Sequence, residues 1–148
     1  MSLAAERIKV NLFECKIKYQ KLNEKGENKK CTEIYLVDAY TFTEAESNIT
    51  EEITPFVSGD FEVNAIKKNN YSELFENENG DKYFKCKLNF ITLDEKSGVE
   101  KKISNYMLVQ ANNVDEAKIN LDNRMKGTMA DYEVESISET KIMDVFKK

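Results

Sequence analysis

The chain has 148 residues, of which 41% are apolar and 33% charged, and a formal net charge of −5. This size fits one domain or two small halves that share a core. This acidic balance argues against binding to duplex DNA, which depends on an excess of basic residues. No apolar run is long enough to cross a membrane, and three cysteines are too few for a disulfide scaffold. We therefore expect a cytoplasmic protein with reduced thiols and no membrane association.

One stretch of the sequence occurs twice, and whole elements follow it in both copies. Residues 13–19 read Phe-Glu-Cys-Lys-Ile-Lys-Tyr, and residues 84–90 read Phe-Lys-Cys-Lys-Leu-Asn-Phe. We divide the chain into a leader and N-terminal extension (1–12), repeat one (13–75), a turn or linker (76–83) and repeat two (84–146). A unit of about 60 residues is marginal alone, so the two repeats are expected to pack as one globular domain.

The first predicted elements of each repeat form a hairpin. Residues 12–22 alternate apolar and polar side chains, which predicts a half-buried strand. A polar turn follows at 23–28, and a second strand is predicted over Cys31–Ala39. We align Tyr35 with Tyr106 and place one inserted residue within the second strand of repeat two. In this alignment Lys102 is the counterpart of Cys31.

A helix is predicted next in each repeat. Thr41 and Glu44 form a capping-box pattern, a hydroxyl followed three residues later by Glu. Asn113 and Glu116 repeat this logic with an asparagine cap. Pro55 is expected to end or distort the last turn of the first helix.

Two further strands close each repeat. A third is predicted over 61–66 and 132–137, and a short fourth over 71–75 and 142–146. Asn79-Gly80 predicts a hairpin turn that pairs the fourth strand of repeat one with the first strand of repeat two. By pseudo-twofold symmetry, residues 142–146 should pair with the strand near Phe13. The predicted fold class is α+β, a tandem duplication of a strand-strand-helix-strand unit with a short extra strand, built on antiparallel sheets with one helix per copy.

The chain contains no histidine, which removes Ser-His-Asp and Cys-His nucleophilic sites and the commonest zinc ligand. Cys15 and Cys86 occupy equivalent apolar positions, where we expect core packing; a redox or metal pair is the alternative. We predict no catalytic residues, no metal site and no cofactor, and therefore no enzyme.

Acidic residues recur at equivalent places in the two repeats. Glu62 matches Glu133, and Glu73 matches Asp144. Such paired carboxylates can bind a divalent cation or act as acid and base, so a metal-dependent enzyme is one alternative function. Solvent-facing strand residues beside lysines are the plainer interpretation.

Lysines and tyrosines accompany the first two strands of both repeats. Lysines interleaved with aromatics on a sheet are typical of single-stranded nucleic-acid binding, whereas lysines can also guard strands against edge pairing. The candidate nucleic-acid-binding residues are Lys16, Lys18, Tyr35, Lys85, Lys87 and Tyr106.

Several stretches together resemble a family of short proteins that is described as a domain of unknown function and occurs in Bacteroides-type gut bacteria and their phages. The Met-Lys-Gly-Thr-Met-Ala-Asp-Tyr run at 125–132 is the most specific. The other stretches are 13–16, 35–39, 42–46, 91–96 and 142–146. The resemblance implies a cytoplasmic protein of phage or mobile-element origin and brings no catalytic residues. We favour a non-enzymatic binding or accessory module with a protein partner, and single-stranded nucleic acid remains an alternative.

Overall fold

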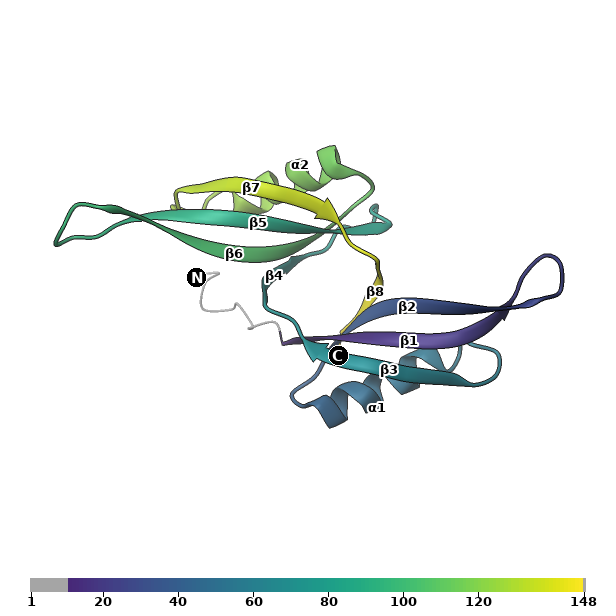
Figure 1. The fold of residues 1–148 in the computed structure, drawn as a ribbon. Helices are drawn as coiled ribbons and strands as arrows, with labels where there is room; N and C mark the ends of the chain where they lie inside the picture. The colour runs from purple at the N-terminus through teal and green to yellow at the C-terminus, as the bar shows by residue number, and fades with distance from the viewer. Residues whose placement is uncertain (1–10, 148) are drawn as a thin grey trace. The chain divides into compact units, whose positions relative to one another are not determined.

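The computed structural model describes residues 11–147, which form eight strands and two helices in the order of the two repeats (Figure 1). The predicted α+β class with one helix per repeat is confirmed. The proposed leader falls largely on residues 1–10, which lie outside the described residues. The elements are β1 (Leu12–Leu22), β2 (Asn28–Asp38), α1 (Phe42–Ile53), β3 (Phe61–Lys68), β4 (Tyr71–Phe75), β5 (Lys82–Leu93), β6 (Glu100–Ala111), α2 (Val114–Met125), β7 (Tyr132–Glu139) and β8 (Ile142–Phe146).

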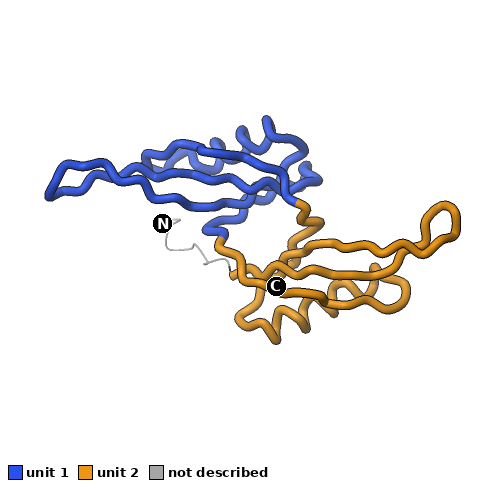
Figure 2. The backbone as a smooth tube through the Cα atoms, in the orientation of Figure 1, with its two compact units in different colours: residues 1–10, 71–140 blue, residues 11–70, 141–148 orange. Residues whose placement is uncertain are grey.

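The described chain divides into two compact units, shown in separate colours in Figure 2. Unit 1 comprises residues 71–140, and unit 2 comprises residues 11–70 and 141–147. Each unit is a four-stranded sheet, in the order β4-β6-β5-β7 in unit 1 and β8-β2-β1-β3 in unit 2. One helix packs on one face of each sheet. That the two repeats pack as one domain stays a prediction.

The short strands are exchanged between the repeats. β8 pairs in parallel with β2, and β4 pairs in parallel with β6. The prediction that each short strand joins the sheet of the other repeat is confirmed, but the predicted partner strand is wrong. Both β1 and β5 already have a neighbour on each side, and the short strands lie instead on the outer edges of β2 and β6.

The turn at Asn79-Gly80 therefore does not join two paired strands. It instead lies against the junction between β6 and α2, where Gln110 Nε2 donates to the Gly80 carbonyl at 2.9 Å. A Cβ atom on Gly80 would lie 2.6 Å from the Cα atom of Ala111. Glycine is required here by this close approach of two backbones.

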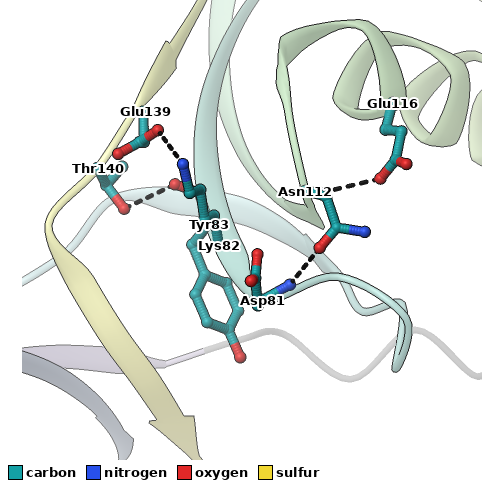
Figure 3. A network of polar contacts seen from close by, with 7 residues as sticks. All are labelled: Asp81, Lys82, Tyr83, Asn112, Glu116, Glu139 and Thr140. Carbon is teal, nitrogen blue, oxygen red and sulfur yellow. Dashed lines mark hydrogen bonds and ion pairs between the residues drawn. The ribbon is translucent and has the colours of Figure 1, made fainter.

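Further hydrogen bonds close the same region of unit 1 (Figure 3). The Asp81 amide donates to Asn112 Oδ1 at 3.1 Å, and the Asn112 amide donates to Glu116 Oε2 at 2.9 Å. At the end of β7, Thr140 donates from both its amide and its hydroxyl to the Tyr83 carbonyl, at 2.9 and 2.8 Å. The start of β5 is thus tied to the ends of β6 and β7.

Both predicted helix caps are confirmed. The Glu44 amide donates to Thr41 Oγ1 at 3.1 Å, and the Glu116 amide donates to Asn113 Oδ1 at 2.8 Å. Each cap satisfies one of the amides that the first turn of a helix leaves without an intrahelical partner. The first helix ends at Ile53, shortly before Pro55.

A duplicated hydrogen bond anchors each helix to its sheet. Asn48 Nδ2 donates to the Asp38 carbonyl and Asn120 Nδ2 to the Gln110 carbonyl, each at 3.1 Å. Both pairs occupy equivalent positions, seventy-two residues apart, in α1 and α2 and in β2 and β6. Because the two repeats keep the same polar contact at the helix–sheet junction, the structure is consistent with a duplicated unit.

The helix-side core of each unit contains one of the paired cysteines. Cys15 and Cys86 are fully buried and free, which confirms their prediction as core residues. Burial raises the pKa of Cys15 to about 12, with Glu14 adding to the effect, and burial raises the pKa of Cys86 to about 11. Both thiols therefore remain protonated at neutral pH.

The strand registers of the two hairpins show that the inserted residue does not lie where the sequence alignment placed it. Tyr35 lies opposite Cys15, whereas Met107 lies opposite Cys86, so Met107 and not Tyr106 is the equivalent of Tyr35. The insertion lies in the turn, which spans 23–27 in repeat one and 94–99 in repeat two. By the same register the counterpart of Cys31 is Ile103, and the predicted match to Lys102 is wrong.

Candidate functional site

In unit 2, four lysines lie on the sheet face opposite α1, and one of them, Lys67, is paired with Glu14 at 3.1 Å. Side chains alternate along a strand, and Phe13, Cys15 and Ile17 point toward the helix. Lys16, Lys18 and Lys30 consequently point to the other side, and we call these three residues the lysine face. Among residues 11–147, no acidic side chain forms an ion pair with any of them.

Tyr35 does not share this face with the lysines. Its ring stacks on Phe146 with centroids 5.5 Å apart, and its hydroxyl donates to Glu33 Oε1 at 3.2 Å. Burial, with help from Glu33, raises the pKa of Tyr35 to about 12. The structure thus places the predicted residue Tyr35 in the helix-side packing, away from Lys16 and Lys18.

A hollow of about 800 Å³ adjoins the lysine face at the end of the β1–β2 hairpin. Its volume lies within the range typical of ligand sites in proteins. Two members of the lysine face contribute to its wall, together with aromatic and small polar residues. The lining residues are Lys18, Tyr19, Gln20, Asn28, Lys30, Cys31, Thr32, Ser58, Gly59, Asp60, Phe61 and Glu62.

In unit 1, the other three predicted residues do come together. Lys87 lies opposite Tyr106 in the β5–β6 register, and the Lys85 ammonium lies 4.5 Å from the centre of the Tyr106 ring. All three are on the face opposite α2. The ammonium therefore covers the ring in a cation–π contact.

Lys87 is held by a polar network that the sequence did not predict. Its Nζ atom lies 2.6 Å from Glu135 Oε2, and Asn89 Nδ2 donates to Glu135 Oε1 at 3.2 Å. Ser104 in turn donates to Asn89 Oδ1 at 2.8 Å. The hydrogen bond from Lys87, followed by that from Asn89, lowers the pKa of Glu135, and the same carboxylate raises the pKa of Lys87.

A β-bulge in β7 places Glu135 in this network. The register between β5 and β7 shifts at Lys87 and Leu88, so Glu135 is the extra residue that has no partner across the strand pair. Nearby, Lys102 Nζ lies 2.7 Å from Glu133 Oε1, and this contact raises the pKa of Lys102. Lys87 and Lys102 are thus neutralised by acids of the same unit, whereas Lys85 covers the Tyr106 ring.

The same positions of unit 2 carry different residues. β3 has an equivalent bulge, but Asn64 stands where β7 has Glu135. Lys18 replaces Asn89, so unit 2 gains a lysine where unit 1 has a buried amide. Unit 2 thus lacks the acidic partner at Lys16 and has a second cation beside it. Both differences are visible in the aligned sequences, but the bulge that brings Asn64 or Glu135 to this place is known only from the register.

The paired carboxylates do not converge within either unit. Glu73 lies on β4 and Glu133 on β7, the two opposite edges of one sheet. Glu62 on β3 and Asp144 on β8 are likewise on opposite edges. Two strands lie between these edge strands, so the two edge strands of each sheet are about 14 Å apart. Within residues 11–147, no three His, Cys, Asp or Glu side chains are grouped closely enough to hold a metal ion.

A family model matches residues 11–148. The chain belongs to the family described as a domain of unknown function (DUF4494). The resemblance to a domain-of-unknown-function family is thereby confirmed, while the bacterial or phage origin stays a prediction. Neither the comparison with curated proteins nor that with solved structures finds a match. Neither described helix has the length and apolar character needed to span a membrane.

Proposed function

We propose that this protein is a non-enzymatic binding module in which the lysine face and adjoining hollow of unit 2 engage an acidic surface of a protein partner. One observation carries the proposal. At equivalent positions, two lysines of unit 1 are neutralised by Glu133 and Glu135, whereas Lys16, Lys18 and Lys30 have no ion-pair partner among the described residues. Unit 2 therefore presents cations that are available to another molecule.

A protein partner fits this face better than nucleic acid does. Binding of single strands relies on aromatic side chains on which the bases stack, and Tyr35 is directed to the helix side. Glu62 is also exposed beside Lys18, which limits the positive charge of the surface. A few cations beside a hollow suit an acidic loop, because complementary charge selects and orients protein partners.

The non-enzymatic and cytoplasmic parts of the proposal rest on the chemistry of the side chains. The chain has no histidine, and its paired carboxylates lie on opposite sheet edges. Three free cysteines suit a compartment that keeps thiols reduced. An origin in gut bacteria or their mobile elements is supported by the sequence resemblance alone.

The test is capture of partners from host lysate by the tagged full chain, with and without nuclease. We expect a protein that survives nuclease and is lost from the double variant Lys16→Glu/Lys18→Glu. The matched control is Lys21→Glu/Lys29→Glu, which makes the same charge change on the opposite face of the same hairpin. Equal capture by both variants would remove the lysine face from consideration.

A second candidate function is single-stranded nucleic-acid binding by unit 1, favoured by the gathering of Lys85, Lys87 and Tyr106 on one face. Oligonucleotide binding should then weaken as salt rises and should drop in Tyr106→Ala. Absence of binding at low ionic strength would reject this candidate.

A further inference from the structure

The two exchanged strands share a sequence pattern. β4 reads Tyr-Ser-Glu-Leu-Phe and β8 reads Ile-Met-Asp-Val-Phe. Both have an apolar first residue, an acid at the third position, an aliphatic residue at the fourth and phenylalanine at the fifth. Two different segments with one pattern occupy equivalent edges, which indicates that the edge selects for side chains as well as for backbone.

The contacts of β8 explain this selection. Val145 lies opposite Leu36, which is fully buried on the face away from the helix. Phe146 lies opposite Val37 and stacks on Tyr35 at 5.5 Å, which adds its ring to the helix-side core. The fourth and fifth positions thus insert into opposite faces of the sheet.

In unit 1, the fourth and fifth residues of β4 make the equivalent contacts. Leu74 lies opposite Leu108, which is fully buried, and Phe75 lies opposite Val109. Phe75 is only 8% exposed, and the Arg124 guanidinium lies 5.6 Å from the centre of its ring. The acceptor edge is therefore built in the same way in both units.

We propose that the outer edge of β2 is a strand-accepting site whose partner in trans is β8 of a second copy of this chain, so that two chains exchange β8 reciprocally. A swapped dimer contains the same strand contacts as the closed monomer, so exchange is a low-cost route to association. The strand is five residues long, and residues 140 and 141 alone join it to β7.

The connection is well defined on the unit 1 side. Two hydrogen bonds to the Tyr83 carbonyl hold Thr140 against β5 (Figure 3), so Thr140 is the last residue anchored in unit 1. Release of β8 consequently opens its pairing with β2 and leaves the sheet of unit 1 intact. This proposal does not depend on the lysine face.

The experiment refolds the full chain at low and at high protein concentration and measures mass by size exclusion with light scattering. We expect a dimer whose fraction grows with refolding concentration. Refolding two wild-type chains with tags of different mass should give mixed dimers in native mass spectrometry. Phe146→Ala weakens the β8–β2 contact in monomer and dimer alike, so it should lower the dimer fraction by leaving more chains with β8 unpaired. Met143→Ala, at a side chain 53% exposed on the same strand, should keep the dimer.

A peptide spanning residues 141–147 provides a readout that does not require a variant to fold. Present during refolding of the wild-type chain, it should lower the dimer fraction, and a scrambled peptide should not. The absence of a dimer at any concentration would overturn the proposal. A dimer that resists both Phe146→Ala and the peptide would do the same, because association would then use another surface.

Discussion

Truncation of the duplicated asparagines should destabilise the protein by an amount that the structure allows us to estimate. Asn120→Ala removes the hydrogen bond that reaches the Gln110 carbonyl at 3.1 Å. Loss of one partner at this part-buried junction costs about 1–3 kcal/mol, and alanine returns about 0.5 kcal/mol through its higher helix propensity. We therefore expect a net loss of about 0.5–2.5 kcal/mol, and the same from Asn48→Ala in the other unit.

The matched control is Asn123→Ala in the same helix, at an exposed position. This control has the same gain in helix propensity but does not remove the hydrogen bond to the Gln110 carbonyl, so it should be neutral or slightly stabilising. Urea unfolding followed by circular dichroism measures all three variants. If Asn120→Ala and Asn123→Ala were equally stable, the junction bond would contribute nothing and this reasoning would be refuted.

Asn120→Asp extends the prediction to pH. A carboxylate would face the Gln110 carbonyl oxygen, so the folded state would disfavour the charged form and raise the pKa of the introduced acid above its unfolded value. Below the unfolded pKa the carboxyl is protonated in both states and can donate as the amide did. The deficit relative to wild type should therefore be small in acid, grow as pH rises from about 4 to the folded pKa, and stay constant above it. A deficit independent of pH would contradict this expectation.

Three other measurements examine separate features. Gly80→Ala would place a Cβ atom 2.6 Å from the Ala111 backbone and should cost about 1–3 kcal/mol of unfolding free energy; an unchanged urea midpoint would show that the turn is loosely held. The pKa of Glu135 is lowered in the folded state. Its contribution to folding stability is therefore present above the unfolded pKa and is lost as pH falls through the folded pKa. Glu135→Gln should therefore flatten the acid side of the stability profile, and an unchanged profile would argue against the network. With a thiol reagent at neutral pH, mass spectrometry should show native protein labelled once, at the partly exposed Cys31, and denatured protein labelled three times.

The local features of the fold were predictable because they depend on short-range chemistry. The caps at Thr41 and Asn113 and the alternation around Cys15 and Cys86 all agree with the structure. The partners of the short strands were not predictable in this way. A five-residue apolar pattern indicates a strand, but only the complete sheet shows that β1 has no free edge and that β8 lies beside β2.

The candidate site was predicted in part, and the wrong placement of Tyr35 has one physical origin. Matching Tyr35 to Tyr106 by identity placed an insertion inside a strand, although the longer turn of repeat two accommodates it. A one-residue shift in a strand moves every side chain to the other face. For this reason Tyr35 was grouped with lysines that it does not meet, while the neutralising role of Glu135 depends on a bulge that composition does not reveal.

The most direct test of the binding proposal rebuilds the unit 1 network in unit 2. Asn64→Glu places a carboxylate at the position equivalent to Glu135, beside Lys16, without removing any lysine. If available cations on the lysine face bind the partner, this variant should lose capture of the nuclease-resistant protein. The control Asn70→Glu, which adds the same charge at an exposed position outside that face, should retain it. Equal capture by Asn64→Glu and wild type would contradict the account.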